Sequence, residues 1–189
     1  MINRCIENSE VFGIVLIPPG TSQESEATIR RVGVTARVVH HERIEDGRLN
    51  IVTNGESRFR ILRFTGNTPY WTADVEFVED DPEEGEELQE SHRNVVRAYR
   101  EMHQLAAKLR ELDAGEIHLP ESPAGLSYMV SSVLSLVPEL SQDLLEMTST
   151  TGRLKSLYVY LEEIARRLSA QILSGGTGPK GKQDGHWVN

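Results

Sequence analysis

The sequence predicts an α+β protein in which a small β barrel or strongly curled sheet is followed by a C-terminal helical bundle. Apolar residues recur with a period of two between about residues 11 and 78, as they do in half-buried strands. From about residue 88 the apolar spacing changes to three and four residues, which is the period of an α-helix. Turn signals separate the expected strands by roughly ten residues, and this spacing favours a barrel or a strongly curled sheet.

The first two expected strands precede a hairpin turn. Residues 11–17 form a continuous apolar run that ends at Pro18–Pro19–Gly20, as in a strand covered on both faces. Residues 32–38 alternate between apolar and other side chains. Asp46–Gly47 then marks a tight turn, because glycine accepts the positive φ that such turns require.

Three further strands are expected after this turn, which brings the total to about five. Residues 48–53 and 57–64 flank Asn54–Gly55, a second hairpin signal. Residues 70–78 show the clearest alternation. One face of this last strand carries apolar side chains and the other carries polar ones: Trp71, Ala73, Val75 and Phe77 against Thr72, Asp74 and Glu76.

An acidic segment separates the two halves of the sequence. Residues 81–90 are expected to link a β-rich part, residues 1–80, to a helical bundle, residues 91–173. Eight carboxylates lie between residues 79 and 90. We expect a solvated linker that leads into a helix, because carboxylates stabilise the amino-terminal end of a helix. An acidic docking site for a basic partner is the alternative.

Four helices are expected in the bundle, joined by connections of a few residues. Their approximate ranges are 88–109, 126–134, 138–147 and 151–173. Pro120 and Pro123 interrupt the chain between the first two helices. Residues 174–189 are rich in glycine and polar residues, so we expect a disordered tail.

The net charge argues against anionic partners, and the motif content argues against catalysis. The formal net charge of −9 disfavours binding to nucleic acid or to an anionic membrane. The string from Gly176 to Lys182 has the spacing of a phosphate-binding loop, but Gln183 stands where magnesium needs a serine or threonine. The six histidines lack the spacing of zinc ligands, and Cys5 is expected to be a small buried residue. We therefore expect no catalytic residue, no cofactor and no metal site, and hence a protein that is not an enzyme.

Cysteine content and hydropathy indicate the compartment. Cys5 is the only cysteine, so no disulfide can form within the chain. The first ten residues lack a secretory apolar region, and no apolar run approaches the roughly 20 residues that span a bilayer. We therefore expect a cytoplasmic protein.

Several short segments occur in a characteristic order. They are FGIVLI at 12–17, VGVTARV at 32–38, DGRLNIVTNGESRFRI at 46–61, Pro69–Tyr70, Pro138–Leu140 and Leu144–Thr148. Together they resemble the amino-terminal, substrate-binding domain of Lon-type ATP-dependent proteases, over about residues 1–173. The resemblance implies a PUA-like pseudo-barrel followed by a helical bundle. The family's opening strands, around a P-L-F-P-L segment and an E-P-R-Y stretch, have no counterpart before the helix at residues 1–6.

The resemblance implies a stand-alone, non-catalytic module that binds unfolded or degradation-tagged protein, without ATPase or peptidase activity. Apolar side chains near the end of the barrel are the candidate contacts: Phe64, Tyr70 and Trp71. Trp71 is in phase with Ala73 and is expected in the core, whereas Tyr70 points to the opposite face. The alternative is an interaction module that docks one folded partner, such as a protease or a chaperone. Strand edges left open by the missing strands would also favour a homodimer.

Overall fold

The computed structural model describes residues 1–18, 26, 28–44, 47–134 and 136–175. Within them it contains five helices and four strands, so the predicted α+β class is confirmed. Asp46, the turn residues after Pro18, most of the tail expected from residue 174, and the string at 176–182 lie outside the described residues. The chain divides into two compact units. We call Met1–Asp81 with Ser135–Thr148 the sheet unit, and Pro82–Leu134 with Ser149–Asn189 the helical unit.

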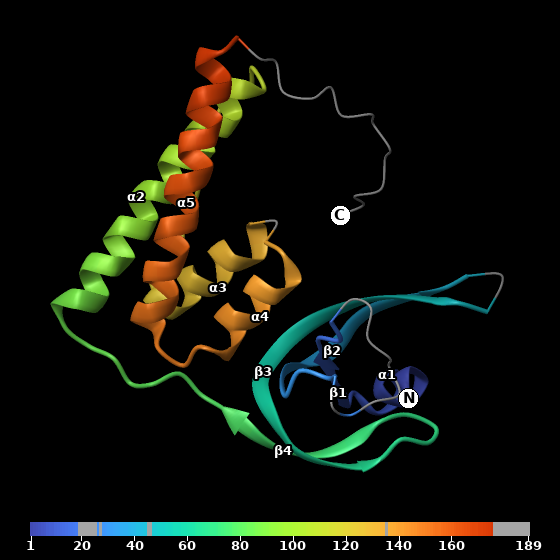
Figure 1. Ribbon diagram of the computed structural model, residues 1–189. Helices are drawn as coiled ribbons and strands as arrows, with labels where there is room; N and C mark the ends of the chain where they lie inside the picture. The colour runs from blue at the N-terminus through green and yellow to red at the C-terminus, as the bar shows by residue number, and fades with distance from the viewer. Residues whose placement is uncertain (19–25, 27, 45–46, 135, 176–189) are drawn as a thin grey trace. The chain divides into compact units, whose positions relative to one another are not determined.

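A single antiparallel sheet of four strands dominates the sheet unit. The strands lie in the order β1-β2-β3-β4, and the sheet is strongly curled (Figure 1). Their bounds are Val11–Val15, Val32–Arg43, Leu49–Gly66 and Thr72–Val78. A short helix, α1 (Ile2–Asn8), contacts β1 and β2 and carries the buried Cys5. The expected turn before residue 48 is present, since Gly47 has a φ of 85° and β2 pairs antiparallel with β3.

The second predicted hairpin, at Asn54–Gly55, is wrong. β3 continues through these two residues as one strand of 18 residues, so the described residues form four strands where about five were expected. Asn54 pairs with Arg37 and Gly55 with Ala36, beside a register shift in β2. A Cβ atom at Gly55 would lie only 3.1 Å from Cγ1 of Val34. The glycine therefore permits close approach of a neighbouring side chain rather than a turn.

The core of the sheet unit lies inside the curve of the sheet. Its buried centre is Ile29, Phe59 and Ile61, and the surrounding half-buried residues are Val15, Ile17, Phe64, Trp71 and Ala73. Gly33 makes room for the ring of Phe59, because a Cβ atom there would lie 2.8 Å from Cζ of Phe59. The same Cβ atom would lie 2.4 Å from the carbonyl oxygen of Ile14, which is backbone and cannot move aside cheaply.

The opposite face of the sheet carries helix α4 (Pro138–Glu146). The Gln142 amide donates to the Val32 carbonyl over 2.9 Å. The Arg58 guanidinium donates to the carbonyl oxygens of Leu145 and Met147, over 2.9 and 2.7 Å. The sequence predicts this helix in the bundle of residues 91–173, whereas its contacts group it with the sheet. The physical reason is that side chains from distant segments hold this helix on the sheet by hydrogen bonds, and helical periodicity gives no sign of such contacts.

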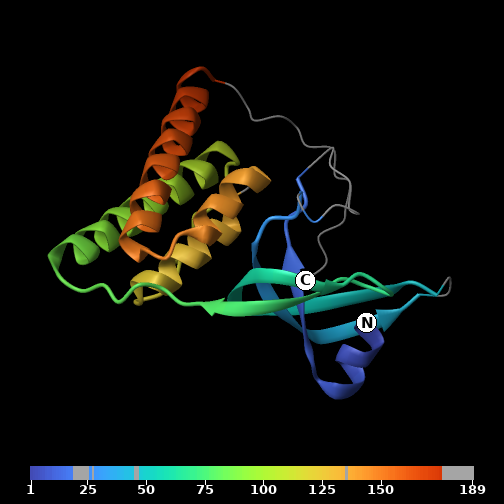
Figure 2. The ribbon, with the colours of Figure 1, turned by 60° about the horizontal axis from the view of Figure 1, so that its bottom comes forward.

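In the helical unit two long helices lie side by side. α2 (Glu86–Leu109) and α5 (Thr150–Leu173) pack along each other in both views, and α3 (Pro123–Val133) packs against α5 (Figures 1 and 2). The predicted apolar stripes form the core of this unit. Its fully buried aliphatic side chains, with no exposed surface, are Val95, Leu126, Val130, Leu154, Leu157 and Leu161. One charged residue, Arg153, is equally buried among them.

Carboxylates of the acidic segment lie at the starts of two helices. Glu86 and Glu87 lie in the first turn of α2, and Glu87 forms an ion pair with Lys155. The carboxylate of Glu83 accepts hydrogen bonds from the backbone N–H and the hydroxyl of Thr151, at the start of α5. Hydrogen bonds from the side chains of Ser149 and Thr151 lower the pKa of Glu83 below its ordinary value of 4.5.

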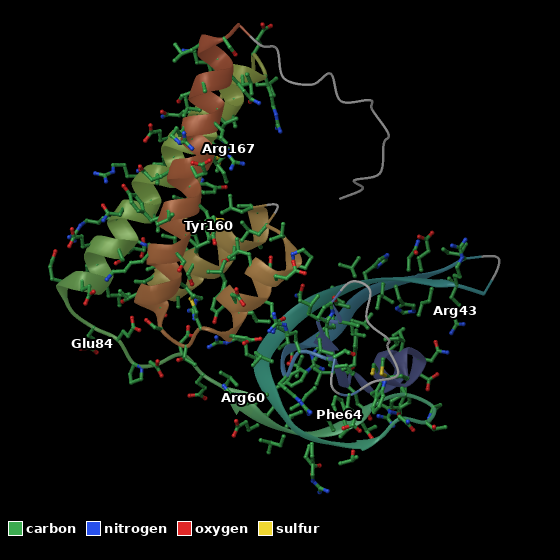
Figure 3. All side chains as sticks on the ribbon, in the orientation of Figure 1. Arg43, Arg60, Phe64, Glu84, Tyr160 and Arg167 are labelled. Atoms are coloured by element: carbon green, nitrogen blue, oxygen red, sulfur yellow. The ribbon has the colours of Figure 1, made fainter. Side chains whose placement is uncertain are left out.

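The lowered pKa of Glu83 predicts how stability depends on pH. A carboxyl group whose pKa is lower in the folded state stabilises the fold above the unfolded value, and this stabilisation is lost as the pH falls through the folded value. We expect Glu83→Gln to be less stable than the wild type at pH 7, and the difference to shrink below about pH 4.5. Urea unfolding followed by circular dichroism at both ends of this range measures the difference. Glu84→Gln, which removes the charge of an exposed neighbour labelled in Figure 3, is the matched control.

Candidate functional site

The edge strand β4 presents apolar side chains that continue the core face of the sheet. Phe77 pairs with Phe59 and Val75 pairs with Ile61 across the β3–β4 ladder. Directly opposite residues of an antiparallel pair share one face of the sheet. Phe59 and Ile61 are only 4% and 6% exposed, whereas Phe77 and Val75 are 67% and 40% exposed. The apolar face therefore extends outward to β4 and ends there without a cover from the described residues. We call Val75 and Phe77 the β4 shelf.

The other face of β4 is charged. Glu76 forms an ion pair with Arg60 over 3.7 Å, and Asp74 forms one with Arg63 over 2.7 Å. All four side chains are 49% exposed or more. In Figure 3, Arg60 lies on the outer side of the curled sheet and Phe64 lies inside its curve. β4 thus combines an apolar face and an acidic face along one edge.

The three residues predicted from the sequence lie close to this strand. Phe64 and Trp71 contact each other, with ring centroids 4.9 Å apart and planes inclined by 60°. Both pack against the buried cluster of the sheet unit, and the Arg31 guanidinium lies 5.1 Å from the Phe64 ring. Tyr70 is half-buried. Phe77 was not among the predicted contacts, although the alternation from Trp71 to Phe77 had already placed it on the same face.

A second apolar surface lies on the outer face of the sheet unit. It is a groove of about 380 Å³ between β1, β2 and β3 on one side and α4 on the other. Ile14, Val34 and Gly55 line it from the sheet, and Pro138 and Leu145 line it from the helix. Ile14 is 50% exposed. This groove is apolar, and no ionisable side chain lines it among the described residues.

Groups with shifted pKa values take part in ion pairs or lie at helix ends. The hydrogen bond from Arg37 lowers the pKa of Glu56, and hydrogen bonds from Arg166 and Arg167 lower that of Glu163.

In the part of the chain that the structure describes, no three His, Cys, Asp or Glu side chains gather as metal ligands would. Nor does any helix there combine the length and apolar character needed to cross a bilayer.

Comparison with known proteins identifies the family. Residues 1–163 match the family model of the ATP-dependent protease La (LON) substrate-binding domain. A Lon protease of Azospirillum brasilense is 30% identical over 137 residues, which is 72% of this chain and 17% of that protein. A Lon protease of Dictyoglomus thermophilum is 22% identical over 179 residues, which is 91% of this chain and 22% of that protein. The chain therefore spans only about a fifth of the length of these relatives.

Solved structures confirm the fold. A Lon N-terminal domain protein from Xanthomonas campestris superimposes with a TM-score of 0.58 at 19% identity, covering 84% of this chain and 80% of that one. The N-terminal domain of a Mycobacterium avium complex Lon protease gives 0.56 at 21% identity, covering 82% and 90%. The chain belongs to the family of ATP-dependent protease La (Lon) substrate-binding domains.

Proposed function

We propose that this chain is a substrate-recognition module that binds unfolded or degradation-tagged polypeptide, itself without ATPase or peptidase activity. The observation that carries the proposal is the β4 shelf, where Phe77 is 67% exposed although its cross-strand partner Phe59 is buried. Unfolded chains display apolar side chains that folded proteins cover. An exposed aromatic side chain beside the packed core is a site at which the apolar side chains of an unfolded chain can bind.

The free energy gained by covering the β4 shelf is small, which suits weak binding of many different sequences. An aromatic side chain buries about 150–250 Å² when it is fully covered, so covering Phe77 is worth on the order of 3 kcal/mol. Val75 adds a smaller area beside it. Part of this energy is spent on ordering the bound chain, so further contacts are needed to reach the roughly 8 kcal/mol of a micromolar affinity.

Tyr70 is the second contact we propose. Its half-buried side chain carries both apolar surface and a hydroxyl group, which suits an adaptable contact. Phe64 and Trp71 support this region by packing on the core, so their replacement would disturb the fold together with any binding.

We further propose that the module works in the cytoplasm, where a lone cysteine such as Cys5 stays reduced.

Phe77→Ser is expected to weaken binding of an unfolded polypeptide by about tenfold, or 1.4 kcal/mol, because the variant removes the exposed ring. Fluorescence anisotropy with a labelled, permanently unfolded polypeptide measures this affinity. The folded form of the same polypeptide should bind much more weakly. Tyr70→Ala should lower the affinity by a smaller factor.

Leu62→Ser is the matched control for Phe77→Ser. Leu62 is 57% exposed on the neighbouring strand β3 but is not part of the shelf, so its replacement should leave the affinity unchanged. Equal binding of the folded and unfolded forms would contradict substrate recognition. It would favour the alternative of an interaction module for one folded partner, such as a protease or a chaperone.

A further inference from the structure

We propose that β4 binds its polypeptide ligand by strand addition and prefers extended segments in which apolar side chains alternate with basic ones. This inference rests on the proposed function and names the class of segment that the same surface recognises. It follows from three properties of β4: an open edge, an apolar face and an acidic face.

The first property is the open backbone edge. β4 is the last strand of the sheet, and its backbone hydrogen bonds to the described residues are those of the β3 ladder. In an antiparallel pair, alternate residues direct their N–H and C=O groups away from the partner strand. The seven residues Thr72–Val78 thus offer a template about 23 Å long for another extended chain.

The second property is the apolar face, which sets half of the pattern in the ligand. A strand added beside β4 places every other side chain on the face of Val75 and Phe77. Apolar side chains at those positions would continue the row that begins at Phe59 and Ile61 and would cover the shelf. Polar side chains there would leave Phe77 in water.

The third property is the acidic face, which sets the other half of the pattern. The remaining side chains of the added strand lie opposite Asp74 and Glu76, whose side chains are 49% and 54% exposed. Each carboxylate already forms an ion pair with one arginine of β3, and its two oxygens leave room for a further donor. Across the sheet the sign of charge then runs basic, acidic, basic. Acidic side chains at these positions would face like charges, which is destabilising.

The other edge strand does not share this combination. β1 has the sequence VFGIV and carries no ionisable side chain. It could pair with an extended chain but could not distinguish a basic ligand from an acidic one. The proposed preference therefore identifies which edge is used.

Three short labelled peptides test the preference by fluorescence anisotropy. One alternates valine with lysine, the second alternates valine with glutamate, and the third has the composition of the first with its valines and lysines in two separate blocks. We expect the alternating lysine peptide to bind roughly fivefold or more tightly than either of the others at low salt. The advantage over the glutamate peptide should shrink as salt increases.

A double variant separates the two halves of the pattern. Asp74→Asn with Glu76→Gln removes both charges and keeps the shape of the side chains. It should abolish the preference for lysine over glutamate while the alternating lysine peptide still binds more tightly than its block isomer. N-methylation of alternate residues in the alternating lysine peptide removes backbone donors, and we expect it to weaken binding about tenfold.

The outcomes distinguish this inference from the proposed function. If the unfolded polypeptide binds and Phe77→Ser weakens it, but all three peptides and the N-methylated one bind alike, strand addition at β4 is wrong and substrate recognition stands. If neither the unfolded polypeptide nor any peptide binds, the proposed function fails and strand addition fails with it.

Discussion

Replacing Arg153 with alanine is expected to lower the free energy of unfolding of the helical unit by about 4 kcal/mol. Arg153 has no exposed surface. Its guanidinium donates to the hydroxyls of Ser127 and Thr150, each over 3.1 Å, and lies 4.5 Å from the centre of the Tyr128 ring. Alanine removes these contacts and leaves a cavity where a long side chain had been packed.

Two further variants separate packing from polarity at this position. Arg153→Met keeps most of the volume and should recover more than half of the loss if packing dominates. Arg166→Ala removes an exposed arginine from the same helix and should change the stability by less than about 0.5 kcal/mol. Native-state hydrogen exchange of the amides in α5 measures all three. A loss below about 1 kcal/mol for Arg153→Ala would contradict the proposed role of the buried guanidinium.

Arg58→Ala is expected to destabilise the sheet unit by about 3 kcal/mol, because it removes a buried charged group that joins three segments of this unit. Arg58 is 8% exposed and lies on β3. It donates to the carbonyl oxygens of Leu145 and Met147 at the end of α4, and it forms an ion pair with Asp80 after β4. Without it we expect α4 to detach from the sheet more readily than the strands separate from one another.

Hydrogen exchange resolved by mass spectrometry tests this prediction on both elements. Amides of α4 should lose more protection than those of β3 in Arg58→Ala. Arg60→Ala is the matched control, because Arg60 lies two residues away, is 49% exposed and forms only a surface ion pair with Glu76. If the two variants lose equal protection in α4, the anchoring role of Arg58 is wrong.

Neither of these two arginines could be identified from the sequence as a residue that holds the fold together. Arginine is rarely fully buried, so neither residue stood out in a sequence that contains 20 lysines and arginines. Their partners lie 26 residues away for Ser127 and 89 for Met147, and spacing along the chain gives no signal at such distances. The expected segments of the bundle were right about helix positions, yet α4 contacts the sheet through such distant polar groups.

The candidate site was partly predictable. The alternation in residues 70–78 correctly separated an apolar face from a charged face, because side chains in a strand alternate whatever surrounds it. The sequence directed attention to Phe64, Tyr70 and Trp71, whereas exposure in the folded chain adds Phe77 as the proposed main contact. Periodicity states which face a residue occupies, but not whether anything covers that face.

The α+β class, the change from strands to helices near residue 88, and the family could all be predicted from the sequence. These properties depend on local periodicity and on the order of short segments. The tertiary structure was needed to place Asn54–Gly55 inside a strand, since pairing with β2 before and after these two residues outweighs the local turn preference. It also decided that the apolar face ends uncovered at β4, because exposure depends on neighbours brought together from distant parts of the chain.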